Sequence, residues 1–356
     1  MKVVVWGTGR TWFQYKHFLK NNIEIVAFVE TAPMSGCFLG KKVIMPEELT
    51  SVEYDYIVIF SVYQDAIFEK MRQCNISENR AITFNQYGEY SSFVRDPFHR
   101  KLKNMRSRRE NAKILITGLS YHNEGIDETK FDDPVVNMAM GSQDLFYDYE
   151  VAKYVMRTQN GGGISYCIIG MSYYSMEYDY SKSCNAQWII RYYPEIADAH
   201  NMMDSAFFPA YAEKEIRRLS QYEYLSGIFE TGRQDYEFSE EEGKRIAQTD
   251  FNKCYPLTIF ENKCILNEYL TFLEDNHIKP IIVIMPAHYY YTHHVPPERK
   301  TLFYKSLNEV LISHRVQVLD YFDTYECPDA HYYHVSHFNE IGASVFTEKL
   351  IQDIRW

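Results

Sequence analysis

Residues 114–120 read Ile-Leu-Ile-Thr-Gly-Leu-Ser, a short apolar run that ends in a glycine and a serine. Similar β-rich runs alternate with helix-like stretches along most of the chain. This alternation is typical of βαβ units and of a parallel sheet, so we predict an α/β fold. Ligands of such sheets bind beyond the carboxyl ends of the strands, so the hydroxyl of Ser120 is expected to face a cleft.

The part of the chain after residue 112 is predicted to form one α/β domain, residues 113–356. Its predicted strands cover 113–117, 164–170, 280–285 and 316–321, and its predicted helices cover 144–158, 260–276, 300–314 and 340–354. Residues 174–256 are rich in Tyr and acidic residues and lack this alternation. They are predicted to form a helical or irregular insertion over the sheet, with a helix beginning near Ser239.

The first 88 residues repeat the pattern on a smaller scale. Predicted strands cover 2–6, 23–29, 56–60 and 81–84, and predicted helices cover 11–21, 46–49 and 65–74. They indicate a small Rossmann-like parallel-sheet domain at residues 1–88. Residues 89–112 are polar and basic and are interpreted as a linker. From Arg95 to Lys113 eight Lys or Arg residues stand against two acids, so a solvated linker helix and a site for an anionic partner are both open.

The bulk composition excludes several classes of function. The chain has 356 residues, 46% of them hydrophobic and 24% charged, which suffices for two globular domains. A formal charge of −11 disfavours nucleic acid or an anionic membrane as a general partner. No apolar run approaches the about 20 residues of a membrane span, and the N-terminus lacks the pattern of a secretory signal, so we expect a cytoplasmic protein. Seven irregularly spaced cysteines predict neither a disulfide framework nor a metal site.

A glycine-rich turn, Gly7-Thr8-Gly9, follows the first predicted strand. Glycines in such a turn let the backbone approach a phosphate, and the helix that follows offers free N–H groups. Glu30 stands at the end of the second strand, where a ribose-binding carboxylate lies in dinucleotide folds. Gly7, Gly9 and Glu30 therefore predict a nucleotide or nucleotide-sugar site. Trp12 replaces the third glycine of GxGxxG, so a structural or oligomerising role is the alternative.

A serine needs a base to take its proton before it can act as a nucleophile at neutral pH. Among the twelve histidines we select His337, in the run Ser-His-Phe-Asn-Glu that precedes the last predicted helix. A loop at that position can return the imidazole to the ends of the strands. We therefore predict that Ser120 and His337 form a catalytic pair.

Gly-x-Ser after a strand, together with His-Phe-Asn-Glu-x-Gly-Ala at the start of the last helix, resembles the SGNH/GDSL hydrolase superfamily. The resemblance covers roughly residues 112–356. It implies a flavodoxin-like three-layer α/β/α domain in which Ser120 attacks an ester carbonyl, His337 is the general base, and no cofactor is required. It also implies oxyanion donors: a backbone N–H of Ala139 or Gly141, and a later position where the family usually has an asparagine amide and this chain has Ser172.

Further candidates for the same cleft follow other strands. Ser142, Tyr173 and His288 are predicted substrate contacts, and the alternatives are a helix cap, ordinary packing and a surface loop, respectively. The family places an aspartate three residues before the histidine, where this chain has His334. We expect His334, or Asp329 from the preceding loop, to be the third triad member, unless a Ser-His dyad acts alone.

These features predict a serine esterase or O-acyltransferase. Residues 1–88 resemble the N-terminal Rossmann-like domain of bacterial sugar acetyltransferases and polysaccharide-biosynthesis proteins, through Gly-Lys-Lys-Val at 40–43 and Pro-Glu-Glu-Leu at 46–49. This resemblance implies a carbohydrate or nucleotide-sugar substrate in surface polysaccharide biosynthesis. One alternative is a degenerate SGNH-like carbohydrate-binding protein, and another is a nucleotide-dependent oxidoreductase or transferase that uses the first domain. The expected ligand is a small molecule or carbohydrate, and a homo-oligomer is open.

Overall fold

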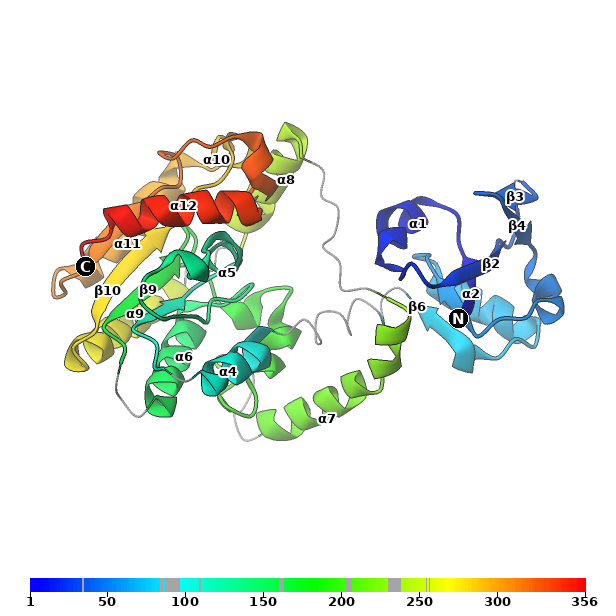
Figure 1. Ribbon diagram of the computed structural model, residues 1–356, viewed down its shortest axis with the longest axis horizontal. Coiled ribbons are helices and arrows are strands. Elements are labelled where there is room, and N and C mark those ends of the chain that lie inside the picture. The colour runs from blue at the N-terminus through cyan, green and yellow to red at the C-terminus, as the bar shows by residue number, and fades with distance from the viewer. Residues whose placement is uncertain are drawn as a thin grey trace. The chain divides into compact units, whose positions relative to one another are not determined.

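Figure 1 shows the computed structural model, which describes residues 1–356 apart from 34, 84–85, 87–96, 109, 160–162, 203–206, 230–237, 254 and 256. The chain forms two compact units. The first comprises Met1–Asp96 with Glu213–Asp235, and the second comprises Pro97–Ala212 with Tyr236–Trp356.

The sheet of the first unit has six strands in the order β3-β4-β2-β1-β5-β6. Their bounds are β1 Lys2–Trp6, β2 Glu24–Val29, β3 Cys37–Phe38, β4 Lys41–Ile44, β5 Tyr56–Ile59 and β6 Ala81–Thr83. Neighbouring strands are parallel except β3 and β4, which are antiparallel. Among the described residues of Met1–Asp96 the helices are α1 (Arg10–Tyr15) and α2 (Gln64–Gln73), with 3-10 turns at Lys16–Phe18, Pro46–Ser51 and Glu78–Arg80. A further 3-10 turn of this unit covers Glu223–Gly227. The helix predicted at 11–21 is therefore a short helix followed by a 3-10 turn.

Both faces of this sheet are apolar because consecutive residues of its central strands are apolar. Alternate side chains of a strand point to opposite sides, so each face receives apolar groups. Val3 and Val5 of the central strand β1 belong to one buried cluster, together with Trp12 from α1. Val4 and Trp6 belong to a second buried cluster, together with residues of α2. Trp12 thus fills the core where a third glycine would leave room.

A segment far along the chain completes the first core. Leu225, Ile228 and Phe229 are buried in the same cluster as Trp12, and Phe229 forms an isolated antiparallel bridge with Leu19. The first unit is therefore discontinuous, and the predicted boundaries of 1–88 omit part of its core. The returning segment lies in a stretch without regular apolar spacing, so its packing partner could not be predicted from the pattern of residues.

The sheet of the second unit has five strands, all parallel, in the order β11-β10-β9-β7-β8. This is the flavodoxin-like strand order, counted from β7 as the first strand. The bounds are β7 Ile114–Thr117, β8 Val135–Asn137, β9 Tyr166–Met171, β10 Lys279–Ile284 and β11 Gln317–Asp320, and a separate hairpin pairs β12 (Tyr332–His334) with β13 (His337–Phe338). The helices are α4 Pro97–Ser107, α5 Ser120–Gly125, α6 Leu145–Thr158, α7 Phe208–Ser220, α8 Glu240–Phe251, α9 Thr258–Asp275, α10 Tyr289–Thr292, α11 Pro297–Leu311 and α12 Glu340–Asp353. Residues of α7 are divided between the two units.

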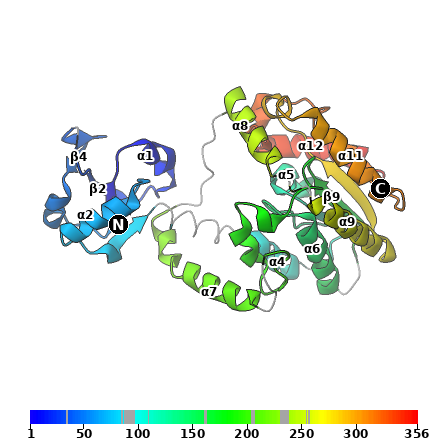
Figure 2. The same ribbon diagram turned by 180° about the vertical axis from the view of Figure 1, so that it is seen from behind.

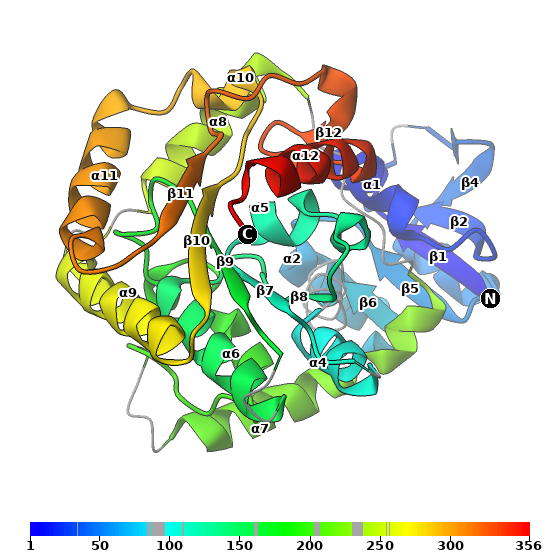
Figure 3. The same cartoon turned by 60° about the vertical axis from the view of Figure 1, so that its left-hand side comes forward.

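Different helices cover the two faces of this second sheet. Ile116 and Val283 cluster with Phe346 of α12 on one face. On the other face the hydroxyl of Tyr269, from α9, lies 3.1 Å from the Thr117 hydroxyl. Figure 1 views the face with α12, and Figure 2 views the opposite face, with α9 and α11 in front. Figure 3 shows the strands between these helices. The predicted α/β class and three-layer arrangement are confirmed.

The predicted linker at 89–112 differs from the structure. Residues 89–96 lie outside the described part of the chain, but Pro97–Ser107 form helix α4, which belongs to the second unit. Phe98, Leu102 and Met105 are buried at the spacing of one helix face. The basic residues between them make the average composition of the segment polar, so the segment resembles a linker although it has an apolar face.

In the parts of the chain that are described, none of the helices has both the length and the apolar character needed to cross a membrane.

Candidate active site

Ser120 stands at the carboxyl end of β7, as the first residue of α5. The turn between them depends on Gly118, which has a φ of +129°. A Cβ atom at this position would lie 2.6 Å from the Cα atom of Gly170 in the neighbouring strand. Only glycine satisfies both conditions, so it fixes the path that delivers Ser120 to the edge of the sheet.

His337 reaches the same edge from the β12–β13 hairpin. His334 and His337 are paired in the register of that hairpin, and Asn339 then caps α12 by accepting hydrogen bonds from the N–H groups of Ile341 and Gly342. His337 Nε2 lies 2.9 Å from Ser120 Oγ. The two residues predicted to form a pair are thus within hydrogen-bond distance.

Two neighbours fix the His337 ring. The ring of Tyr121 stacks on it, with centroids 4.8 Å apart and an angle of 28° between the planes. Ser336 Oγ lies 2.9 Å from His337 Nδ1 and 3.0 Å from His334 Nδ1. A serine hydroxyl therefore occupies the place where a triad has its carboxylate. Ser336 was not among the residues selected from the sequence.

The predicted third members are placed differently from each other. His334 contacts Ser336 through Nδ1, and its ring centroid lies 5.7 Å from that of His337. Asp329 lies elsewhere, with Oδ1 3.1 Å from Nε2 of His288. If His337 accepts the Ser120 proton at Nε2, its Nδ1–H donates to Ser336, whose O–H then donates to His334. Burial and the neighbouring His337 lower the pKa of His334 to about 4, so His334 is neutral at pH 7 and supplies no countercharge.

The predicted oxyanion donors separate into two groups. The Ala139 N–H donates to Oδ1 of Asn137 at 3.0 Å, and Ala139 is fully buried, so this donor is already engaged. The Gly141 backbone lies beside the nucleophile, because a Cβ built on Gly141 would be 4.0 Å from Cβ of Ser120. Ser142 lines the same cavity as Ser120.

Three other predicted contacts lie away from this cavity. Ser172 is buried, and its N–H donates to the Ser175 hydroxyl at 2.9 Å. Tyr173 is buried with its hydroxyl 2.8 Å from Asp320 Oδ2. His288 and Asp329 line a second cavity instead. Ser172, Tyr173 and His288 follow strands of the sheet as predicted. Their side chains, however, point into the core or line the second cavity, and the position of a residue after a strand does not determine where its side chain points.

The cavity at Ser120 has a volume of about 370 Å³ and a polar lining. Asp250 Oδ2 accepts hydrogen bonds from the hydroxyls of Tyr121 and Tyr291, and Lys253 pairs with Asp250 at 2.6 Å. Burial raises the pKa of Tyr121 and of Tyr174 well above the usual range, so both keep their protons. The lining residues are Leu119, Ser120, Tyr121, Glu124, Ser142, Tyr174, Tyr178, Asn185, Ile246, Asp250, Lys253, Tyr333, His334, Ser336 and His337.

Several of these lining residues come from the insertion, whose residues form no recognisable motif. Asn185 precedes the 3-10 segment Ala186–Tyr192, and Asp250 and Lys253 lie at the end of α8 and just beyond it. A larger cavity of about 800 Å³ is lined by Arg108, Glu110, residues 126–129 and residues 131–135. It lies where β8 begins, at the amino ends of the strands, far from the Ser120 edge.

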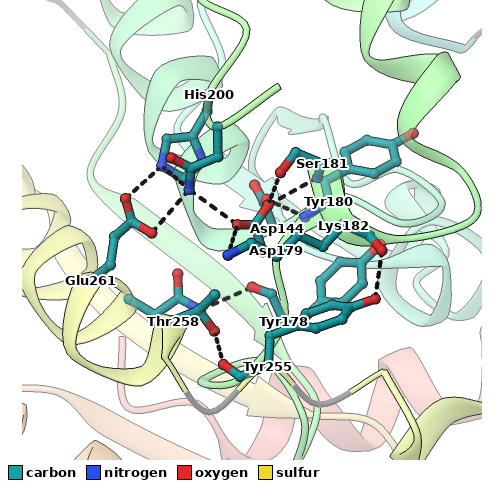
Figure 4. Close-up of polar contacts among 12 residues, drawn as sticks. Asp144, Tyr178, Asp179, Tyr180, Ser181, Lys182, His200, Tyr255, Thr258 and Glu261 are labelled. Carbon is teal, nitrogen blue, oxygen red and sulfur yellow. Dashed lines mark hydrogen bonds and ion pairs between the residues drawn. The ribbon is translucent and has the colours of Figure 1, made fainter. Parts of the chain in front are cut away.

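Asp144, Asp179 and His200 form a group of potential metal ligands among the described residues. One ligand atom of each lies within 4.8 Å of the others. Figure 4 shows how these groups are already engaged: Asp144 accepts from the Tyr180 N–H at 2.8 Å, and Asp179 pairs with Lys182 at 2.9 Å. Their oxygens cap helices and bind cationic or N–H groups, so we interpret the group as a polar cluster that joins the insertion to α6.

In the first unit the structure brings Gly7, Gly9 and Glu30 together. Glu30 Oε1 accepts hydrogen bonds from both the N–H and the hydroxyl of Thr8, each at 2.6 Å. Gly7 has a φ of +113°, and a Cβ there would lie 2.4 Å from the carbonyl oxygen of Phe60. The Glu30 carboxylate thus binds the N–H of Thr8, a group of the turn that could otherwise bind a phosphate. Nucleotide binding at this turn stays a prediction.

One family model matches the N-terminal part of the chain, and several solved structures are similar to the chain. Residues 1–82 match the family model "C2185-like, N-terminal". No curated protein sequence matches the chain. Similar solved structures include a Bacteroides fragilis protein provisionally assigned as an acylhydrolase, with 10% identity, a TM-score of 0.36, and coverage of 74% of this chain and 95% of that one.

Two further solved structures are similar at the same level. One is a Streptococcus pneumoniae protein provisionally assigned as a platelet activating factor, with 10% identity, a TM-score of 0.38, and coverage of 72% of this chain and 91% of that one. The other is an alpha/beta hydrolase enzyme from the metagenome of Lake Arreo, Spain, with 11% identity, a TM-score of 0.32, and coverage of 70% and 96%. Likeness of this degree does not transfer an activity, so the site is interpreted from its own geometry.

Proposed function

We propose that this protein is a serine esterase or O-acyltransferase whose nucleophile is Ser120 and whose general base is His337. The observation that supports this most directly is the 2.9 Å distance between His337 Nε2 and Ser120 Oγ, in a cavity open to a small ligand. A serine becomes a useful nucleophile only when a base stands at this distance.

The reaction would proceed in two steps. Ser120 Oγ attacks the carbonyl carbon of an ester while His337 Nε2 takes the hydroxyl proton, and the leaving alcohol departs with that proton. Water or an acceptor hydroxyl, deprotonated by His337, then attacks the acyl-serine and releases Ser120. Water as acceptor gives hydrolysis, and a sugar hydroxyl gives acyl transfer.

The proposed substrate is an acylated carbohydrate or nucleotide-sugar of surface polysaccharide assembly. Four tyrosines and Lys253 line the cavity, which offers ring faces for stacking and hydroxyl and ammonium groups for hydrogen bonds. Sugars present both apolar faces and hydroxyls, so such a lining suits them.

The test compares wild type and Ser120→Ala on p-nitrophenyl acetate and on an acetylated sugar. We expect Ser120→Ala to reduce kcat by about 10³ or more, because it removes the nucleophile. Equal rates for the two proteins would exclude the proposal. His337→Asn is the second variant, and it should lose activity to a similar degree.

A second candidate function is carbohydrate binding without turnover. The observation that favours it is the Ser336 hydroxyl beside His337 Nδ1, where a carboxylate would stabilise the imidazolium. This candidate predicts that an acetylated sugar binds with the same affinity to wild type and Ser120→Ala and that neither protein hydrolyses it.

A further inference from the structure

The insertion delivers an amide group into the cavity at Ser120. Asn185 Nδ2 donates a hydrogen bond to Ser142 Oγ at 2.8 Å, and both residues line the cavity with Ser120. Ser142 directly follows Gly141, whose backbone lies beside Ser120. The amide therefore stands on the same side of the cavity as the Gly141 turn.

The backbone on each side of this contact is held in place. The Tyr180 N–H is bound by Asp144 in the polar cluster of Figure 4, and the Asn185 N–H donates to the Ser183 hydroxyl at 3.1 Å. On the other side Ser142 has a φ of +65°. Its carbonyl oxygen accepts a hydrogen bond from the Tyr178 hydroxyl at 3.1 Å.

A left-handed backbone is unfavourable at a non-glycine residue, and it persists where the surrounding contacts hold it in place. Here the strained residue is the one that contacts the amide. The hydrogen bonds around Ser142 therefore hold its left-handed backbone, and with it the position of Asn185 relative to the Gly141 turn.

We propose that Asn185 is a catalytic residue that donates a hydrogen bond from Nδ2 to the oxyanion formed when Ser120 attacks its substrate. This proposal rests on the proposed function. A primary amide carries two N–H donors, and only one is used by Ser142. As the Ser120 Oγ–carbon bond forms, the carbonyl electron pair moves onto oxygen, and the second N–H meets the developing charge. When the pair returns, the bond to the leaving alcohol breaks.

Other donors fit this role less well. The Ala139 N–H is engaged by Asn137. Ser172, which the resemblance marked as an oxyanion position, is buried with its N–H bound to Ser175. In this proposal the donor amide comes from the insertion and not from the residues that follow β9.

The test uses Asn185→Leu, which keeps a similar size without a donor, and Asn185→Asp, which keeps the shape. Loss of one preorganised oxyanion donor reduces kcat by about 10² to 10³, with KM changed little. The affinity of phenylboronic acid, which forms a tetrahedral adduct with the serine, should fall in the same variants. Cys184→Ala, at the exposed neighbouring position, is the matched control and should behave as wild type.

The outcomes separate the two proposals. If Ser120→Ala is inactive but both Asn185 variants keep kcat and boronate affinity within about threefold of wild type, Asn185 is not an oxyanion donor and the proposed function stands. If wild type itself has no turnover that depends on Ser120, the proposed function fails first. If Asn185→Leu does not fold, as judged by its thermal transition, Asn185→Asp decides.

Discussion

The hydroxyl of Ser336 lies 2.9 Å from Nδ1 of His337, on the side of the imidazole opposite Ser120. A neutral group thus holds the ring that we propose as the base. A hydroxyl can fix the tautomer by accepting the Nδ1–H, but it cannot neutralise the imidazolium. We infer that the imidazolium of His337 is stabilised less than in a triad with a carboxylate, because its neighbours Ser336 and His334 are neutral.

Ser336→Ala tests this positioning role. Without the hydroxyl the Nδ1–H loses its acceptor and the ring can turn away from Ser120, so we expect kcat to fall by about 10- to 100-fold, below the loss in a carboxylate triad. Ser336→Thr, which restores the hydroxyl, should recover most of the activity. A pH profile of kcat that is unchanged in shape and size in Ser336→Ala would show that Ser336 has no such role.

The stability of the second unit should fall on mild acidification. Burial lowers the pKa of His122 to about 4, and that of His334 also lies at about 4. The unfolded chain, with ordinary histidine pKa values, binds more protons between about pH 6.5 and 4. The contribution of these histidines to the free energy of unfolding is therefore fully present above pH 6.5 and is lost as the pH falls toward 4. For His122 alone this loss is about 3 kcal/mol.

Thermal unfolding at several pH values measures this effect. The slope between pH 6.5 and 4 should be smaller in His122→Asn, although that variant is less stable at pH 7. His277→Asn provides the control, because His277 is exposed. An equal slope in wild type and His122→Asn would contradict the assignment.

Ile228→Ala should destabilise the first unit, although the residue lies 145 positions beyond the end of β6 at Thr83. Ile228 is fully buried in the cluster that contains Trp12, and such a truncation costs about 2–5 kcal/mol. The expected result is an earlier unfolding transition with a changed Trp fluorescence. Ile312→Ala, at a side chain that is 84% exposed, should leave the transition unchanged. A first unit that is unaffected by Ile228→Ala would contradict the discontinuous core.

Gly118→Ala should abolish activity and lower stability together. The added Cβ would meet the backbone of Gly170, and the φ of +129° is strained for alanine. The end of β7 must then shift, and Ser120 shifts with it. Gly36→Ala is the control, since nothing lies within 4 Å of a Cβ there. Wild-type turnover in Gly118→Ala would show that the turn does not need glycine.

The sequence was sufficient to predict the α/β class, most strands of both sheets, and the convergence of Ser120 with His337. This succeeded because parallel strands end at a common edge and a last helix can begin there. The prediction failed for residues whose place depends on the direction of a side chain and not on the end of a strand. Ser336 folds back from a hairpin turn, Asn185 comes from an irregular segment, and Phe98, Leu102 and Met105 form an apolar stripe hidden among basic residues. The boundary at residue 88 failed because core partners of β1 return after residue 212.

The most direct test of the central claim is covalent labelling with a fluorophosphonate probe, followed by peptide mass analysis. The account predicts one equivalent of label on Ser120 in wild type, no label in Ser120→Ala, and slow labelling in His337→Asn. A wild-type protein that stays unlabelled on Ser120, or that is labelled at the same rate without His337, would contradict it.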